Sequence, residues 1–182
     1  PVNVVDSDIA ILTNVELDHQ DWLGEDRESI GKEKADIFKF QKPVILGQHK
    51  VPNSVLENCV KMENQVYRVG EEFNYLVDDA NRRWSYSFEG DKKVSFSNIE
   101  LNSFSVSSLS CALTAFCLLE EEVNVDLDSV LDTLDLIGRC ELVDKRFLLD
   151  VSHNESSAKY LASFIQRNFD EQIEINAVFG VM

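Results

Sequence analysis

The sequence has few glycines, and their spacing excludes the common phosphate-binding loops. The seven glycines lie at positions 24, 31, 47, 70, 90, 138 and 180. No two of them are close enough to form G-x-x-x-x-G-K-[ST] or G-x-G-x-x-G, the loops whose backbone N–H groups surround a phosphate. The chain therefore has no phosphate-binding loop of its own.

Paired cysteines and basic residues are also scarce. The cysteines Cys59, Cys111, Cys117 and Cys140 show no C-x-x-C spacing and no neighbouring histidine pair, so zinc binding is poorly supported and reduced core thiols are expected. The chain carries 33 acidic against 17 basic residues, a formal net charge of −16. Such a charge repels nucleic acid and anionic lipid, so we expect neither as a partner.

Membrane spans and targeting signals are absent from the sequence. No run of about 18 apolar residues exists, and the N-terminus lacks a basic region followed by an apolar segment and a cleavage site. We therefore expect a cytoplasmic protein. The chain opens at Pro1 and closes on an apolar, strand-like run at 175–182. Because a following helix normally covers such a strand, we expect an internal piece of a longer polypeptide.

The first part of the chain alternates between strand and helix patterns. Residues 8–15 and 43–47 are apolar runs typical of buried strands. Between them the apolar residues of 26–38 have helical spacing, with Asp26 as a plausible cap, and 54–64 suit a short helix. A strand, a helix and a second strand in this order predict parallel pairing and an α/β fold.

The pattern then changes twice. Residues 66–101 contain short alternating runs typical of antiparallel hairpins, and helices are expected at 106–121 and 126–136. In the second of these helices Val130, Leu131 and Leu134 are expected to face inward. A second strand-helix-strand unit is then expected, with strands at 147–151 and 175–181 and a helix at 156–168 between them. We place a domain boundary near 137–141.

Two polar loops follow predicted strands, at Leu17–Gly24 and Asp150–Asn154. Both occupy the position where open α/β sheets bind ligands, beyond the carboxyl ends of the strands. On residue type alone, His19 suits a metal ligand, a general base or a histidine hydrogen-bonded in a polar loop, and the last is the commonest case. The same alternatives apply to His153. On residue type alone, Lys34 is expected to be a solvated surface lysine.

Four motifs in chain order resemble those of one enzyme family. Residues 13–24 (TNVELDHQDWLG) are similar to the histidine motif of the Mur ligase superfamily in its folate-enzyme form. Residues 26–38 are similar to its R-E-x-I-G-x-E-K-A-G-I-F helix, with Asp36 in place of the usual Gly. Residues 137–139 match its P-G-R, and residues 149–154 match its D-V-A-H-N-P. The chain thus resembles the bifunctional dihydrofolate synthase/folylpolyglutamate synthases throughout.

The resemblance implies a fold and an activity. Residues 1–138 would be the second half of a Mur-ligase-type central ATPase domain, and residues 139–182 the start of a Rossmann-like C-terminal domain. The implied enzyme is a monomeric ATP-dependent ligase with Mg²⁺ as cofactor, which adds L-glutamate to dihydropteroate and to reduced folates through an acyl phosphate. Since the family's phosphate loop has no counterpart here, we expect this chain alone to be inactive.

The same resemblance assigns roles to single residues. His19 matches a ligand of the second magnesium ion, and Lys34 matches a lysine that carries a carbamate. Magnesium is a hard ion that neutralises crowded phosphate oxygens, so such a site suits phosphoryl transfer.

ATP contacts are implied further along the chain. Arg139 matches a contact to the phosphates and Asp150 a contact toward the nucleoside, while His153 and Asn154 on the same loop are weaker matches. An arginine fork suits a phosphoryl group. Ser108 stands where the family has an adenine-contacting Asn, which puts that contact in doubt.

Two alternatives remain open. One is another Mur-type ligase, acting on cell-wall peptide precursors, which shares the general pattern. The motif Asp21-Trp22-Leu23-Gly24, however, favours the folate branch. A non-catalytic fragment that binds a partner is the second alternative. It is encouraged by Ser108, by Glu155 in place of the proline of D-V-A-H-N-P, and by the missing phosphate loop.

Overall fold

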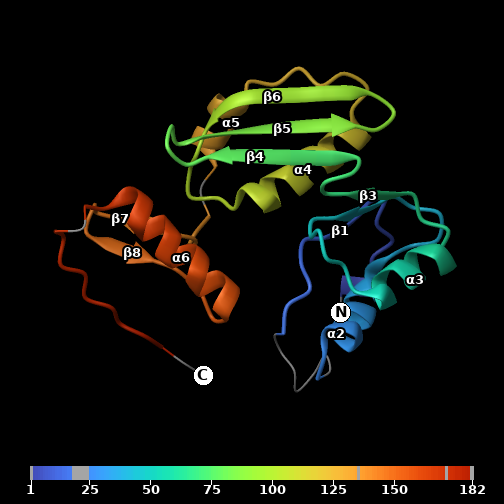
Figure 1. The fold of residues 1–182 in the computed structure, drawn as a ribbon, viewed down its shortest axis with the longest axis horizontal. Coiled ribbons are helices and arrows are strands. Elements are labelled where there is room, and N and C mark those ends of the chain that lie inside the picture. Colours follow the sequence, from blue (N-terminus) through green and yellow to red (C-terminus); the bar gives the residue numbers. More distant parts are fainter. Residues whose placement is uncertain (1, 18–24, 135, 171, 181–182) are drawn as a thin grey trace. The chain divides into compact units, whose positions relative to one another are not determined.

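The computed structural model describes residues 2–17, 25–134, 136–170 and 172–180. The chain divides into two compact units, Pro1–Asp132 and Thr133–Met182 (Figure 1). The assignment of residues 1–138 and 139–182 to two ligase domains stays a prediction.

The first unit begins with a three-stranded parallel sheet. After a short 3-10 turn, η1 (Val2–Val4), strands β1 (Ala10–Leu12), β2 (Val44–Leu46) and β3 (Val66–Arg68) pair in that order, and both pairs are parallel. Helix α2 (Arg27–Lys34) and the 3-10 turn η2 (Ala35–Ile37) connect β1 to β2, and α3 (Asn53–Lys61) connects β2 to β3. The predicted strand-helix-strand unit and the α/β class are confirmed.

Helix α2 starts at the predicted cap. The carboxylate of Asp26 accepts a hydrogen bond of 2.7 Å from the backbone N–H of Ser29, which satisfies one of the free donors at a helix start. Ile30 on this helix is fully buried and packs with Val44 and Leu46 in one core cluster. The α-helix ends at Lys34, earlier than predicted.

Strand β3 corrects one prediction. Residues 66–68 were expected to belong to the antiparallel region, but they pair parallel with β2. Tyr67 at the centre of β3 is 3% exposed, because it packs with Ile45 and Phe73 in the core cluster next to the parallel sheet. The free energy gained by burying Tyr67 favours pairing of this segment with the edge of the parallel sheet.

An antiparallel sheet with the predicted hairpins follows. Strands β4 (Phe73–Asp78), β5 (Arg83–Glu89) and β6 (Lys93–Glu100) pair in chain order. Alternate residues of β5 are buried, and Figure 1 shows helix α4 (Val106–Leu119) lying along this sheet. Tyr86 of β5 shares a 2.8 Å hydrogen bond with the Thr114 hydroxyl, which joins the sheet to the helix inside the core.

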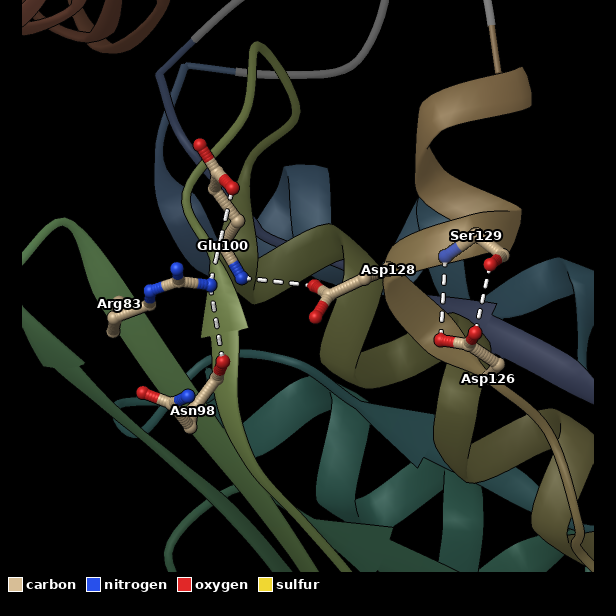
Figure 2. Close-up of polar contacts among 6 residues, drawn as sticks. All are labelled: Arg83, Asn98, Glu100, Asp126, Asp128 and Ser129. Carbon is tan, nitrogen blue, oxygen red and sulfur yellow. Dashed lines mark hydrogen bonds and ion pairs between the residues drawn. The ribbon is translucent and has the colours of Figure 1, made fainter.

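Polar contacts attach the end of β6 to helix α5 (Leu127–Thr133), as Figure 2 shows. The N–H of Glu100 donates to the Asp128 carboxylate at 3.0 Å, and Arg83 lies 3.9 Å from the Glu100 carboxylate. The Asp126 carboxylate accepts from the Ser129 hydroxyl at 2.7 Å in the first turn of the helix. These exposed contacts fix where α5 starts.

Helix α5 is shorter than predicted, and its inward face differs. Leu127 and Leu131 are buried, but Val130 and Leu134 are 41% and 47% exposed, so their predicted inward orientation is wrong. The reason is that the helix begins at Leu127 and ends at Thr133, so Leu134 lies outside it and Val130 falls on its solvent side.

The second unit contains a hairpin and one helix. Strands β7 (Glu141–Val143) and β8 (Phe147–Leu149) pair antiparallel, and α6 (Glu155–Asn168) follows close to its predicted position. The expected second strand-helix-strand unit is not found in the described chain, because β8 pairs with β7 and residues 175–180 form no strand. A strand needs a neighbour for its N–H and C=O groups, and no strand among the described residues pairs with 175–180.

The cysteines are free and buried, as predicted. Burial raises the pKa of Cys59 and of Cys111 to about 11, which keeps these thiols protonated. Among the described helices, none has the length and apolar character needed to cross a membrane.

Candidate functional site

Two short segments leave the carboxyl ends of neighbouring parallel strands. We name residues 13–17, after β1, the β1 loop, and residues 47–51, after β2, the β2 loop. They meet at Gly47, whose N–H donates to the carbonyl of Leu12 at 3.0 Å. A Cβ atom at Gly47 would lie 2.5 Å from Sγ of Cys111 and 2.9 Å from the carbonyl oxygen of Thr13. Only glycine allows this close approach.

Gln48 joins the two loops. Its Oε1 atom accepts a 3.0 Å hydrogen bond from the backbone N–H of Val15, and its Nε2 donates to the Glu16 carboxylate at 3.0 Å. The Val15 side chain is only 1% exposed, so the β1 loop is anchored in the core at the same residue. The segment that leads toward the predicted histidine loop is thus fixed up to Glu16.

Arg27, the first residue of α2, reinforces this junction. Its Nε donates to the carbonyl of Val15 at 3.0 Å, while Nη2 donates to the carbonyl of Lys50 at 2.7 Å and to Oε1 of Gln48 at 3.2 Å. A guanidinium presents several donors in a rigid plane, so one side chain holds both loops.

Lys34, the predicted carbamate carrier, lies against the β1 loop. Its Nζ donates to the carbonyl of Asn14 at 3.2 Å, and the residue is half-buried. The end of α2 therefore returns to the loop that follows β1, as the predicted site requires. His19 lies among residues 18–24, which are outside the described residues, so its role as a metal ligand stays a prediction.

The β1 loop, which Lys34 contacts through Asn14, carries groups of the kind that bind magnesium. The Asn14 carbonyl and the Glu16 carboxylate are hard oxygen donors, which Mg²⁺ prefers. In the part of the chain that the structure describes, no three acidic, histidine or cysteine side chains gather into a metal-binding group. These residues therefore fit part of a magnesium site, which would need further ligands.

The loop after β8 carries the second group of predicted residues. The Asp150 carboxylate accepts from the N–H of Cys140 at 2.9 Å, from the N–H of Ser152 at 2.8 Å and from the Ser152 hydroxyl. Burial alone would raise the pKa of Asp150, but the hydrogen bonds from Ser152 and Cys140 outweigh it and hold the pKa below its ordinary value. Asp150 is thus an ionised group that fixes its own loop.

Arg139 lies on the segment beside this loop. It is exposed and follows Gly138, whose φ of +70° is a left-handed conformation that suits glycine. The carbonyl of Gly138 accepts from the N–H of Val151 at 3.0 Å, and Cys140 binds Asp150. The structure therefore brings Arg139 and Asp150 onto adjacent segments of one unit.

The remaining predicted residues have local roles. The side chain of Asn154 accepts from the N–H of Ser157 at 2.9 Å and caps helix α6. His153 is exposed, with Nδ1 3.0 Å from the carbonyl of Val151. Ser108 is exposed in the first turn of α4, in the other unit. Their contacts to ATP stay predictions.

Arg27 and Gln48 are not among the predicted site residues. The available signal was position, since Gln48 follows the strand at 43–47 directly and Arg27 opens the helix after the histidine loop. Gln48 belongs to a strand end where α/β sheets bind ligands, and the Arg27 side chain reaches the same two loops from α2.

Known proteins similar to this chain are ligases of one kind. No protein-family model matches. The dihydrofolate synthase/folylpolyglutamate synthase of Escherichia coli K12 is 37% identical over 163 residues, which are 87% of this chain and 37% of that protein. This chain therefore spans well under half the length of that relative.

Solved structures give the same result. E. coli FolC in complex with DHPP and ADP matches with a TM-score of 0.81 and 34% identity over 93% of this chain and 40% of that chain. The bifunctional folylpolyglutamate synthase/dihydrofolate synthase of Yersinia pestis, complexed with AMPPNP and Mn, matches with a TM-score of 0.74 and 30% identity over 91% of this chain and 40% of that chain.

Proposed function

We infer, from its homology to the dihydrofolate synthase/folylpolyglutamate synthase family, that this chain forms part of an ATP-dependent ligase that adds L-glutamate to dihydropteroate and to reduced folates. The observation that carries this proposal is the agreement in sequence and fold with one kind of ligase over most of the chain. Residues 1–138 and 139–182 then belong to its central and C-terminal domains.

The ligands of the similar proteins support the substrates and the chemistry. E. coli FolC binds DHPP and ADP, and a related synthase binds Mn, AMPPNP and L-glutamate. In the proposed reaction a carboxylate oxygen takes the γ-phosphoryl group of ATP, which gives an acyl phosphate and ADP. The glutamate amine then attacks the acyl carbon, phosphate leaves, and an amide forms with loss of a proton.

The described residues have clear tasks in this scheme. Arg139 would bind the phosphoryl oxygens through its fork, while the ionised Asp150 keeps the adjacent loop in place toward the nucleoside. Lys34, as a carbamate, and His19 would take part in the magnesium site. When bound, magnesium neutralises the charge of the phosphates during transfer.

The proposal includes the setting in which the ligase acts. It is a monomeric cytoplasmic enzyme without nucleic-acid or membrane partners. Four buried free thiols and a net charge of −16 support this part of the proposal.

The test is product formation by the complete polypeptide that carries this segment. Supplied with dihydropteroate, L-glutamate, ATP and Mg²⁺, it should form dihydrofolate, and ADP release should stop when glutamate is omitted. Arg139→Lys should lower kcat about tenfold, because a point charge does not replace the guanidinium fork. Arg146→Lys, in the same unit, is the matched control and should keep the full rate. Activity only with a cell-wall peptide precursor, or none at all, would overturn the proposal.

A further inference from the structure

We propose that Gln48 and Arg27 are positioning residues that hold the Asn14–Val15 peptide unit against Nζ of Lys34. The catalytic consequence of this inference rests on the proposed function, whereas the positioning itself does not. Neither side chain needs to touch a substrate for this role.

One planar peptide unit carries the argument. The carbonyl of Asn14 and the N–H of Val15 lie in the same rigid peptide plane and point in opposite directions within it. Lys34 donates to that carbonyl at 3.2 Å, and Gln48 accepts from that N–H at 3.0 Å. The peptide is therefore held at both ends by side chains from α2 and from the β2 loop.

Arg27 prevents this plane from turning. It donates to the next carbonyl, that of Val15, at 3.0 Å, and it also binds Oε1 of Gln48 at 3.2 Å. With the Val15 side chain buried in the core, its N–H, its carbonyl and its side chain are all fixed. The Asn14 carbonyl thus has a defined direction toward Lys34.

The arrangement suits a lysine that changes its chemical state. A carbamate keeps one N–H on the former amine nitrogen, so the Asn14 carbonyl can accept from that nitrogen before and after modification. The new carboxylate then extends beyond the nitrogen, in a direction set by the same hydrogen bond. Gln48 and Arg27 would in this way orient the carbamate without contacting it.

Selective lysine labelling tests the positioning without any assay of activity. The complete polypeptide that carries this segment is treated with trace acetic anhydride, and acetylation at Lys34 is compared with that at Lys32 on the same helix. Gln48→Met removes the three hydrogen bonds of this side chain, to Val15, Glu16 and Arg27, at similar volume and should raise the Lys34 to Lys32 ratio about threefold. Gln48→Glu keeps an acceptor for the Val15 N–H and should restore part of the protection.

The controls separate positioning from general loosening. Arg27→Lys should raise the same ratio, whereas Arg68→Lys, at a half-buried arginine of β3 paired with Glu71 at 2.8 Å, should leave it unchanged. An unchanged ratio in Gln48→Met overturns the inference, and so does an equal rise at Lys34, Lys32 and Lys61, which would indicate partial unfolding.

The same variants in the complete ligase give the catalytic readout. Gln48→Met and Arg27→Lys should lower kcat while KM for glutamate stays the same. Selective labelling without any effect on kcat would leave the positioning intact and remove its catalytic purpose. Failure of the labelling arm alone would overturn the positioning and leave the proposed ligase activity untouched.

Discussion

Gln48 and Lys34 bind opposite ends of the peptide unit between Asn14 and Val15, at 3.0 and 3.2 Å. Gln48 comes from the loop after β2 and Lys34 from the end of α2, so two elements converge on the segment after β1. In a parallel sheet this is the edge where ligands bind. The conformation of the β1 loop at this edge is set by hydrogen bonds from side chains to its backbone groups.

Gly47→Ala should destabilise the first unit by about 2 kcal/mol. The new methyl group would lie 2.5 Å from Cys111 Sγ and 2.9 Å from the Thr13 carbonyl, so the packed junction has to shift. Thermal or urea unfolding measures the loss. Gly180→Ala is the matched control, because no atom lies within 4 Å of its added Cβ. Equal stability of both variants would contradict the packing described here.

Asp150→Asn should lower the stability of the second unit by about 1 kcal/mol at neutral pH. The carboxylate accepts hydrogen bonds from Cys140 and Ser152, and charged acceptors bind more strongly than neutral ones. The value is small because the group is partly solvated. Urea unfolding of wild type and variant at pH 7 gives the difference.

The pH dependence of that difference has a defined sign. Since the pKa of Asp150 is lower in the folded chain than its ordinary 3.8, its contribution is fully present above 3.8 and is lost as the pH falls through the folded value. The gap between wild type and Asp150→Asn should therefore close in acid. A gap that stays constant from pH 7 to about pH 2 would show that the charge contributes nothing.

Local patterns predicted the elements well, because their causes lie within a few residues. The cap at Asp26 needs only Ser29, three positions on, and the spacing of apolar residues after it predicts one buried helix face. The pairing of β3 depends instead on which sheet buries Tyr67, and that choice is made by residues far along the chain.

The candidate site was predicted only in part for the same reason. Lys34 was found through a motif, and the structure places it at the β1 loop. Gln48 acts on the backbone of a residue 33 positions earlier, and Arg27 on one 12 positions earlier. Their positions at a strand end and a helix start were the available signal, because neither residue type nor spacing identifies a side chain that binds a distant peptide group.

In the complete ligase, His19→Ala should raise the magnesium concentration needed for half-maximal rate by about tenfold. Loss of one ligand lowers the affinity of the site for magnesium, while the contacts of the ion to the phosphates remain. Initial rates over a magnesium titration provide the measurement. His49→Ala, at the second histidine of the chain, whose ring lies beside Gly70, is the control and should leave the titration unchanged. Identical titration curves for the wild type and both variants would show that His19 is not a metal ligand but a histidine hydrogen-bonded in a polar loop.

The last prediction concerns the chemical state of Lys34. A neutral amine adds to carbon dioxide, an N–C bond forms, and a proton leaves, so the product is an anion where a cation stood. Beside magnesium the anion attracts the metal, whereas an ammonium would repel it. Lys34→Ala in the complete ligase should therefore lower kcat about 100-fold, and added acetate should restore part of it by filling the vacated anion position.

The ranking of two charged substitutions decides between carbamate and cation. Lys34→Glu keeps a negative charge on a shorter side chain, and Lys34→Arg keeps a positive charge that can still donate to the Asn14 carbonyl. If Lys34 acts as a carbamate, Lys34→Glu should retain more activity than Lys34→Arg, since only the former presents oxygen atoms to the metal. If Lys34 acts as a simple cation that anchors the β1 loop, the order reverses. Steady-state kcat of the two variants, at saturating magnesium and with Lys32→Arg as the control on the same helix, distinguishes the cases, and an Lys34→Arg variant near the wild-type rate would end the carbamate hypothesis.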